Sequence, residues 1–314
     1  MKEELHTPQT EAGCYHVPVL RERSVELLVT DPDGIYIDAT FGGGGHTRCI
    51  LEQLSAQGHL YGFDQDPDAA ANAPEDERFT FIASNFRYAA HWMEYYGVSQ
   101  VQGILADLGV SSHHFDTPER GFSFRFEEAL PDMRMNPRAG ISAAELINSA
   151  AESELADILY QYGELHDARQ IAAALVKSRT DMPIQSMERL VACLQPYLPH
   201  ASEQRRNKLS RIFQAFRIEI NDELGALKAL LTASEELLPV GGRIAILTYH
   251  SLEDRIVKQW LKQEVTITKQ QAMLYGAAPR LFKAVNNKPI TAGADELARN
   301  SRSRSAKLRV AERQ

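Results

Sequence analysis

Residues 34–47 read GIYIDATFGGGGHT, and this stretch decides the fold. The run IYIDA (35–39) is short and apolar, and it is bounded by Gly34 and by a run of glycines, which is typical of a buried parallel strand. Four glycines, Gly42–Gly45, then precede a helix expected over 47–54. Such a turn lets the backbone approach a ligand closely and points the N–H groups of the helix at it. The stretch therefore predicts a ligand-binding turn in an α/β fold.

Short apolar runs of the same kind recur after this turn's helix. They are HLYGFD (59–64), FTFIA (79–83), GILA (103–106) and, much later, RIAILTY (243–249). A helical stretch is expected at about 88–96, between the runs at 79–83 and 103–106. Strands that alternate with helices predict a doubly wound, Rossmann-like α/β sheet.

The alternation stops after the fourth strand. Residues 117–140 are rich in Pro, Gly, Arg and Phe and are expected to form a loop. Ser142 and Glu145 have the spacing of a capping box, which opens a helix. Amphipathic helices are then expected over 151–162, 166–179, 186–195 and 208–238.

We interpret the chain as one sheet domain interrupted by an all-helical insert. The first part of the sheet domain is residues 1–116, the helical insert is residues 117–210, and the second part is residues 211–314. Residues 306–311 (AKLRVA) alternate like a half-buried strand and are expected at the edge of the sheet.

The spacing of the glycines distinguishes between two kinds of cofactor. The dinucleotide fingerprint G-x-G-x-x-G fails, because its last position falls on Thr47 when counted from Gly42 and on Arg48 when counted from Gly43. Asp38, just before the turn, suits a cation better than a pyrophosphate. S-adenosylmethionine carries a sulfonium and an ammonium, so the residues favour it over NAD. A tight turn whose glycines serve packing alone is the alternative.

Three residues at the ends of predicted strands are candidates for ligand contacts. Asp64 ends the second strand and can accept both hydroxyls of a ribose; a helix N-cap is the alternative, which suits Asp66 better. Phe86 can stack on an adenine or belong to the core. Asp107 ends the fourth strand, at the edge where such sheets bind ligands, or forms a turn before Gly109.

Composition excludes several classes of protein. The N-terminal MKEELHTPQT is polar and acidic, unlike a signal or transit peptide, and no apolar run approaches the ~18 residues that span a bilayer. Cys14, Cys49 and Cys193 show no CxxC spacing, which argues against a zinc site and against a disulfide framework. We therefore expect a cytoplasmic protein with no metal and no membrane partner.

The charge is unevenly distributed along the chain. Net charge is −8, yet residues 1–120 hold only 7 of the 34 Lys and Arg and 19 of the 42 Asp and Glu. Local basic patches, rather than total charge, make phosphate contacts. Two clusters can do so or can be solvated faces: Arg205, Arg206, Lys208, Arg211 and Arg217, and Arg299, Arg302, Arg304, Lys307 and Arg309.

Seven blocks of the sequence, in order, resemble one bacterial family, once called MraW and now called ribosomal RNA small-subunit methyltransferase H. The blocks are GIYIDATFGGGGHT, ADLGVSS (106–112), ERGFSF (119–124), PDMRMNP (131–137), SRIFQAFRIEINDEL (210–224), YHSLEDRIVK (249–258) and NSRSRSAKLRVAER (300–313). The resemblance implies a methyltransferase sheet with an inserted helical domain. It also implies S-adenosylmethionine as cofactor, 16S rRNA of the small ribosomal subunit as partner, and N4-methylcytidine at the ribosomal P site as product. Oligomeric state does not follow from it.

The resemblance also assigns residues to the cofactor site. Gly42 and Gly43 would serve the turn, Asp64 would hold the ribose, Phe86 would pack on the adenine and Asp107 would lie beside the cofactor. His114 stands where the family has Gln; it can still donate a hydrogen bond, or it can be an exposed loop histidine. The expected cofactor-binding set is Gly44, Gly45, His46, Asp64, Phe86, Asp107 and His114.

Asp107 is the candidate catalytic residue. Cytosine N4 is a weak nucleophile, and a carboxylate that accepts its N–H enriches the lone pair and takes the proton afterwards. The DPPY motif of other amino-methyltransferases is missing, so this role is a hypothesis from the position of Asp107. Tyr249 and His250 are second candidates.

The remaining motifs concern the nucleic acid. Phe122 and Phe124 can stack on a base that has left its helix or can be packing residues. Arg134 and the two basic clusters would hold the RNA backbone. Two other functions stay open: the same cofactor with a small-molecule or DNA target, and a nucleotide-binding or assembly module without catalysis.

Overall fold

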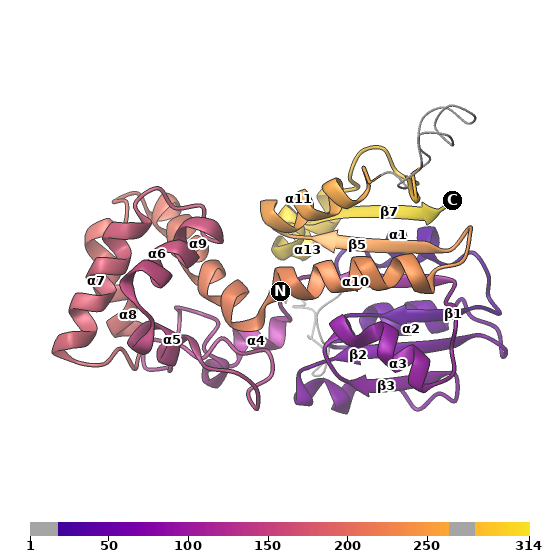
Figure 1. Cartoon of the computed structure of the whole chain (residues 1–314), viewed down its shortest axis with the longest axis horizontal. Helices are drawn as coiled ribbons and strands as arrows, with labels where there is room; N and C mark the ends of the chain where they lie inside the picture. Colours follow the sequence, from indigo (N-terminus) through magenta and orange to yellow (C-terminus); the bar gives the residue numbers. More distant parts are fainter. Residues whose placement is uncertain (1–17, 264–279) are drawn as a thin grey trace, which may run out of the picture.

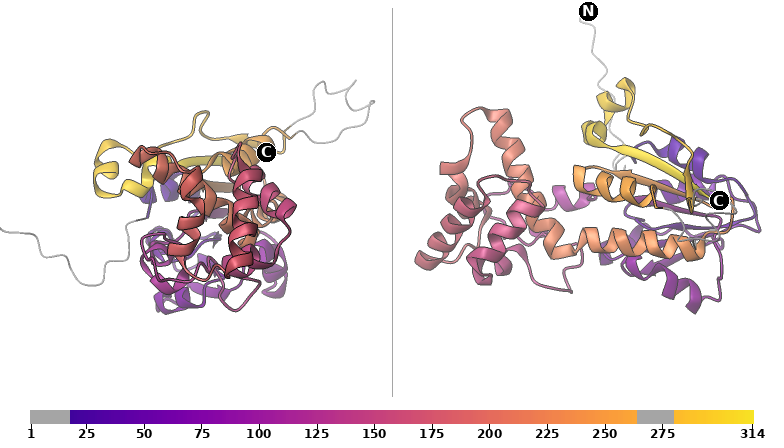
Figure 2. Two further views of the ribbon diagram at one scale, coloured as in Figure 1. Left: turned by 90° about the vertical axis from the view of Figure 1, so that its left-hand side faces the viewer. Right: turned by 45° about the horizontal axis from the view of Figure 1, so that its top comes forward.

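The computed structural model describes residues 18–263 and 280–314 of the chain. Cys14 and the polar N-terminal stretch considered above lie outside these residues. The described chain forms two parts that lie end to end, a sheet covered by helices and a group of helices without strands (Figure 1). A second view confirms that the helical part projects from one end of the sheet (Figure 2).

Within the described residues, seven strands form one sheet in the order β3-β2-β1-β4-β5-β7-β6. Strands β1 to β5 are parallel, whereas β7 runs antiparallel to both β5 and β6. This confirms the predicted α/β sheet. The strands are β1 (Ile35–Asp38), β2 (His59–Asp64), β3 (Phe79–Ala83), β4 (Gly103–Asp107), β5 (Arg243–Thr248), β6 (Phe282–Ala284) and β7 (Lys307–Arg313).

The strand order reverses between β1 and β4. The chain builds outward from β1 through β2 to β3, then returns to the other side of β1 for β4 and β5. Asp38 of β1 is paired in register with Gly62 of β2 and Leu105 of β4, so the three strands end at one edge. A crevice at such a reversal, outside the carboxyl ends of the strands, is where these sheets bind ligands.

Alternate side chains of each strand enter two different cores. On β5, Ile244 and Ile246 pack in one core, and Ala245 and Leu247 pack in the other. This period of two follows from the pleat, and it buries both faces as a parallel sheet requires. The first core takes side chains from α3 (Ala89–Tyr95), α10 (Glu223–Leu237) and α11 (Ser251–Trp260), the second from α1 (Arg21–Leu28) and α2 (Gly45–Leu51).

The helical part has a hydrophobic core of its own, which runs from Phe122 to Phe216. Helix α5 (Ala143–Ser149) of this part begins at the predicted capping box: the Glu145 N–H donates to Ser142 Oγ at 3.2 Å, and the Ser142 N–H donates to Glu145 Oε2 at 2.7 Å. The helices are α4 (Ser112–Asp116), α5 (Ala143–Ser149), α6 (Glu152–Gln161), α7 (Ala168–Asp181), α8 (Met187–Leu194) and α9 (Ser202–Asn221).

The boundary expected at residue 210 lies inside α9. Phe213 and Phe216, beyond it, pack in the helical core, whereas Leu227 and Leu230 of α10 pack on the sheet. Two helices replace the single one expected over 208–238, because Asp222 between them has a left-handed backbone with φ of 45°. Asp is among the residues that tolerate this conformation. We propose that the helical part extends to Asn221.

The C-terminal strand differs from expectation in its place. β7 lies inside the sheet, next to β5, and the short strand β6 forms the edge. The sequence around β6 has no alternation that predicts a strand. The remaining short helices are α13 (Ala294–Arg299), η1 (Pro67–Asn72), η2 (Phe86–Tyr88), η3 (Pro118–Arg120), η4 (Gln195–Tyr197) and η5 (Ser301–Ser305). Among the described helices, none has the length and apolar character needed to cross a membrane.

Candidate active site

A cavity of about 430 Å³ lies at the carboxyl edge of the sheet, where the strand order reverses. This volume is typical of a small-molecule site. Residues that follow β1, β2, β3, β4 and β5 all contribute to its wall, together with α4 and the C-terminal segment. Of the predicted cofactor-binding residues, the cavity brings together Gly45, His46, Asp64, Phe86, Asp107 and His114.

The glycine turn forms one wall, but its glycines divide differently from expectation. Gly42 and Gly43 line the cavity, whereas Gly44 does not. Gly44 precedes α2 with φ of 71°, and its N–H donates to the Phe41 carbonyl at 2.8 Å, so it shapes the turn. A Cβ on Gly45 would lie 2.1 Å from Pro18, so glycine is required there by close packing.

Asp38 holds the turn instead of facing a cationic ligand. Its side chain is fully buried and is absent from the cavity wall. It accepts hydrogen bonds from the Thr40 N–H at 3.1 Å and from Thr47 Oγ1 at 2.7 Å. Thr40 Oγ1 in turn accepts the Asp107 N–H at 2.7 Å, which ties the end of β1 to the end of β4. The prediction that Asp38 faces a cationic ligand was therefore wrong.

Asp64 lines the cavity beside the glycine turn. Its carboxylate accepts the Gly42 N–H at 2.7 Å and the Asp66 N–H at 2.8 Å. Burial raises the pKa of Asp64 to about 6, although these two hydrogen bonds favour the ionised form. The N-cap role belongs to Asp66, which accepts the Asp68 N–H at the start of η1, as the sequence predicted.

The cavity wall also contains Phe86 and three residues that were not predicted from the sequence, Gln65, Asn85 and Met135. Phe86 borders the cavity and also packs on the core of the sheet, so stacking on an adenine stays a prediction. Asn85 Nδ2 donates to Gln65 Oε1 at 2.9 Å, and Gln65 Nε2 contacts Met135 Sδ at 3.2 Å. Gln65 and Asn85 directly follow β2 and β3. Their position after parallel strands could have marked them as site residues from the sequence alone. Met135 comes from the 117–140 loop, where no local pattern marks it.

Asp107 lies at the centre of the cavity wall with its side chain 19% exposed. Tyr249 Oη donates to Asp107 Oδ1 at 2.7 Å, and His46 Nδ1 lies 3.9 Å from Asp107 Oδ2. Burial raises the pKa of Asp107, and the nearby His46 and the Tyr249 hydroxyl oppose that rise. His46 Nε2 is buried with no hydrogen-bond partner among the described residues, so the cavity wall carries one polar atom for a ligand to satisfy.

His114 is part of a buried network and is not an exposed loop residue. Its Nε2 lies 2.7 Å from Asp66 Oδ2, and its ring stacks on Phe122 with centroids 4.7 Å apart. Arg120 Nη1 donates to both oxygens of Asp66, at 3.0 and 2.8 Å. Burial raises the pKa of Asp66, but the hydrogen bonds from His114 and Arg120 outweigh it and lower the pKa to about 2. Burial lowers the pKa of His114.

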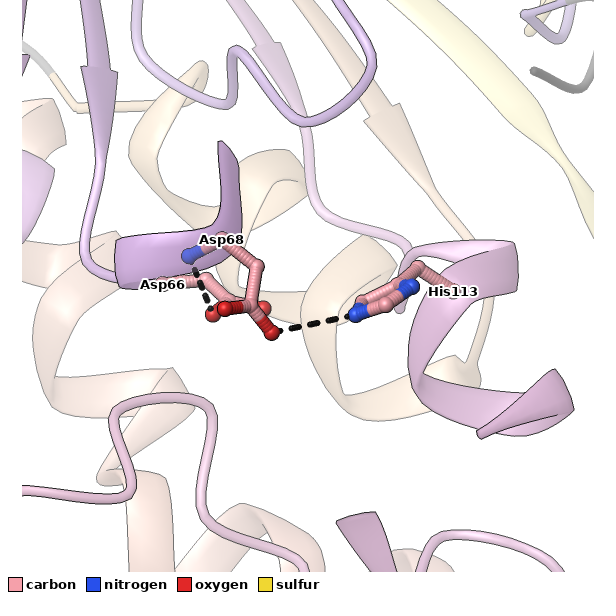
Figure 3. A group of neighbouring side chains, drawn as sticks. All are labelled: Asp66, Asp68 and His113. Carbon is pink, nitrogen blue, oxygen red and sulfur yellow. Dashed lines mark hydrogen bonds and ion pairs between the residues drawn. The ribbon is translucent and has the colours of Figure 1, made fainter. Parts of the chain in front are cut away.

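The same network includes a group with metal-ligand spacing, Asp66, Asp68 and His113 (Figure 3). His113 Nε2 lies 3.1 Å from Asp68 Oδ2, and the Asp68 N–H donates to Asp66 Oδ1. Arg120 Nη1 reaches Asp68 Oδ2 at 3.1 Å as well as both oxygens of Asp66. The guanidinium therefore supplies the positive charge that an ion would bring to these carboxylates.

The two phenylalanines proposed to stack on a base serve packing instead. Phe122 is buried against His114, and Phe124 meets Phe213 of the helical core with centroids 5.4 Å apart. Neither lines the cavity. The aromatic side chain that does so from this region is Phe115 on α4, with the Arg302 guanidinium 5.4 Å from its ring centroid.

The predicted basic clusters separate into paired and exposed residues. Arg309 is buried, and its Nε donates to Asp254 Oδ1 at 2.8 Å, so it is not available to a phosphate. Arg134 pairs with Asp132 at 2.7 Å, and Arg217 lines the cavity while it pairs with Glu223. Arg206 and Arg304 are exposed.

The cavity fits the predicted cofactor. Asp64 offers carboxylate oxygens to the hydroxyls of a ribose, and Phe86 offers an aromatic wall. His46 Nε2 has no hydrogen-bond partner among the described residues, so a ligand could supply one. Asp107 adds negative charge near a sulfonium. No buried lysine or arginine stands at the described glycine turn to match a pyrophosphate: Arg48 there binds the Gly43 carbonyl and is exposed.

Comparisons with known proteins show the family of the chain. The model of the MraW methylase family matches residues 13–314. The chain is 50% identical to the ribosomal RNA small subunit methyltransferase H of Porphyromonas gingivalis, over 98% of this chain and 100% of that protein. It is 51% identical to the protein of the same name from Parabacteroides distasonis, over 96% and 98%.

A solved rRNA methylase from Streptococcus thermophilus aligns at 14% identity, with a TM-score of 0.38 over 93% of each chain. The family match, unlike this distant likeness, spans nearly all of the sequence at high identity. The chain therefore belongs to the MraW methylase family, as a methyltransferase whose cofactor is S-adenosylmethionine.

Proposed function

We propose that this enzyme methylates the exocyclic N4 amine of a cytidine at the P site of 16S rRNA, in the cytoplasm. The name of these relatives supports ribosomal RNA of the small subunit as the substrate class. The observation that carries the choice of an amine is Asp107, whose Oδ2 is directed to the cavity without a hydrogen bond from the described residues. A carboxylate at the reacting centre suits a nucleophile that must lose a proton.

Some residues of the cavity would bind the methyl donor, and Asp107 would act on the methyl acceptor. S-adenosylmethionine supplies a methyl group already activated by its sulfonium. Asp64 would accept its ribose hydroxyls, the backbone of Gly42 and Gly43 would approach it closely, and Phe86 would border its adenine. These contacts would fix the donor relative to Asp107, and such alignment is a large part of catalysis when the leaving group is already good.

Asp107 would then act on the acceptor. The lone pair of cytosine N4 is delocalised into the ring, so the free amine attacks slowly. An N4–H bond donated to Asp107 Oδ2 would localise that lone pair, and the carboxylate would take the proton as the new bond forms. Asp107 Oδ1 is already committed to Tyr249, which leaves Oδ2 for this task.

The position of the cavity supports a large polynucleotide substrate. Phe115, Arg302 and Arg217 line the cavity, and α4, which carries Phe115, lies at the junction of the sheet and the helical part (Figure 1). A base must leave its stack to reach a buried donor, and an enzyme needs surface on both sides to hold the strand. An enzyme that methylates a small molecule would not need a helical part of this size to hold its substrate.

Transfer of tritium from labelled S-adenosylmethionine tests the substrate class. Small subunits that lack the modification, naked 16S rRNA and DNA of matched sequence are offered in parallel. We expect label in the subunit or in the rRNA and none in DNA. Label in DNA alone, or in none of the three while the enzyme binds its cofactor, would contradict the proposal in favour of the alternatives considered above.

A further inference from the structure

Tyr249 follows β5 at the edge of the sheet that carries the cavity. Its hydroxyl donates to Asp107 Oδ1 at 2.7 Å, and its side chain is part of the cavity wall. Asp107 has one other hydrogen-bond donor near this oxygen, the Gly109 N–H, at a long 3.5 Å. Tyr249 therefore supplies the strong hydrogen bond to the carboxylate at the centre of the site.

Tyr249 is held at its backbone and packed closely at its ring. The Tyr249 N–H donates to Glu253 Oε2 at 2.8 Å, and Glu253 is itself buried at the start of α11. A Cβ added to Gly109 would lie 2.8 Å from Tyr249 Cε2 and 3.0 Å from its Cζ. Gly109 follows β4, so the chain leaves room beside Asp107 for this ring and for no side chain of its own.

Because Oδ1 is occupied, the orientation of the carboxylate is set. Asp107 Oδ2 is left 3.9 Å from His46 Nδ1, beyond hydrogen-bond distance, and open to the cavity. We propose that Tyr249 is a positioning residue for methyl transfer, which keeps Asp107 ionised and leaves its Oδ2 available to the substrate amine. This inference rests on the proposed role of Asp107 in that reaction.

The charges around the pair make the hydroxyl necessary. Burial, and then Glu253 of α11, disfavour the ionised form of Asp107. His46 of α2 and the Tyr249 hydroxyl act in the opposite direction. Burial and the charge of Asp107 in turn raise the pKa of Asp38 of β1. Burial raises the pKa of the Tyr249 phenol, and the negative charges of Asp107, Glu253 and Glu296 of α13 raise it further, so Tyr249 remains a donor. Loss of the hydroxyl is therefore expected to raise the pKa of Asp107.

The variant Tyr249→Phe keeps the ring and removes only the donor. Single-turnover methyl transfer is measured against pH at saturating cofactor and RNA. We expect the acidic limb of the rate profile to move up by about one pH unit, because a hydrogen bond to a charged group contributes roughly this much. The affinity for S-adenosylmethionine should stay close to that of the parent.

Tyr36→Phe is the matched control. Tyr36 is also a buried tyrosine, and its hydroxyl donates to the Asp31 carbonyl at 2.9 Å and accepts the Asp31 N–H at 3.1 Å, remote from the cavity. This variant should lower thermal stability without any shift of the pH profile. A shift of equal size in Tyr36→Phe would reduce Tyr249 to a structural role and overturn the proposal.

A spectroscopic readout separates this inference from the proposed function. Infrared difference spectra of ¹³C-aspartate-labelled enzyme, with Asp107→Asn as the blank, follow the ionisation of the Asp107 carboxyl directly. We expect it to titrate at higher pH in Tyr249→Phe than in the parent. If the parent transfers no methyl to RNA, the proposed function fails while the spectra still test Tyr249. Identical carboxyl titrations in parent and variant overturn the inference.

Discussion

The sheet part and the helical part bury different kinds of side chain. Between residues 143 and 216 the buried side chains are all hydrophobic, and they form one core. The sheet part instead buries charged residues, among them Asp38, Asp66, Glu253, Asp254 and Arg309. Removing charge from water costs free energy unless each group is paired, so each of these groups needs a partner.

Pairing accounts for most of these charges, and the exception is informative. Asp254 binds Arg309, Asp66 binds Arg120 and His114, and Asp38 binds the glycine turn. Asp107, in contrast, keeps one oxygen without a hydrogen bond from the described residues, at the wall of the cavity. The comparison therefore predicts that substitution of Asp107 affects chemistry, that substitution of a paired charge affects stability, and that substitution in the helical core affects folding without affecting cofactor binding.

Asp107→Asn should have the largest effect. The amide keeps the shape of the side chain but cannot take a proton, so methyl transfer should fall by about 10²- to 10⁴-fold. Because Asp107 also places negative charge near the sulfonium, cofactor affinity should fall as well, but by much less than the rate. Single-turnover rates and calorimetric titration with S-adenosylmethionine measure the two quantities separately. A variant that binds the cofactor and transfers methyl at the parent rate would remove Asp107 from the mechanism.

Asp66→Asn should be the most destabilising change beside the site. It leaves the buried guanidinium of Arg120 without its main carboxylate, which costs about 3–5 kcal/mol of unfolding free energy. Because the pKa of Asp66 is lowered to about 2, its contribution is complete above the ordinary value near pH 4 and disappears toward pH 2. Urea unfolding of parent and variant at pH 7 and pH 3 should therefore show a difference that shrinks at the lower pH.

Asp76→Asn is the control for that experiment. Asp76 also has a pKa lowered to about 2 by its hydrogen bonds with Arg78, but both side chains are partly exposed. Its loss should cost less than about 1 kcal/mol, as is usual for ion pairs in contact with solvent. A cost equal to that of Asp66→Asn would mean that burial of the Asp66 network has no special weight.

Leu175→Ala tests the helical side of the comparison. Leu175 of α7 is fully buried in the helical core, so the cavity left behind should lower stability by about 3 kcal/mol. Affinity for S-adenosylmethionine should remain that of the parent, since no residue between 143 and 216 lines the cavity. Denaturant unfolding and cofactor titration check the two statements, and a tenfold loss of affinity would break the separation of the two parts.

Asp64 should make cofactor binding depend on pH. Its pKa is raised to about 6, so the carboxyl is protonated below that pH and no longer accepts both ribose hydroxyls. Affinity for S-adenosylmethionine should therefore be about tenfold lower at pH 5 than at pH 7. In Asp64→Asn the affinity should be lower throughout, with this pH dependence removed. Retention of the same dependence in the variant would assign it to another group.

The smallest effect is expected at the exposed C-terminal arginine. Arg304→Gln should reduce the slope of RNA affinity against salt concentration by about one, as the loss of one phosphate contact does. Arg309→Gln, which breaks a buried pair with Asp254, should lower stability and leave the slope unchanged. Equal slopes for the parent and Arg304→Gln would exclude a phosphate contact at this position.

The sequence predicted those features that depend on local patterns. Apolar runs marked every parallel strand, and the Ser142 capping box marked the start of α5. Asp64 and Asp107 could be found because parallel strands end at one edge. By contrast, β6 has too few residues for a period, and the left-handed Asp222 that divides α9 from α10 has no distinctive pattern around it.

The rest of the site depends on contacts between distant segments. The bonds of Asp66 to Arg120 and His114 join residues about fifty positions apart, and Arg309 meets Asp254 across a similar separation. No local pattern reports whether an arginine is buried in a pair or exposed to solvent. The same holds for Phe122, because only the packed structure shows its ring against His114 instead of the cavity.

The acceptor atom is the most direct test of the account. Small-subunit rRNA methylated by the enzyme from ¹⁴C-methyl-labelled S-adenosylmethionine is digested to nucleosides, which are then separated and identified by mass spectrometry. We expect label in N4-methylcytidine with the parent enzyme and no label there with Asp107→Asn. Label in 5-methylcytidine or in another nucleoside would contradict the account, because a carbon acceptor has no N–H for the open oxygen of Asp107 to receive.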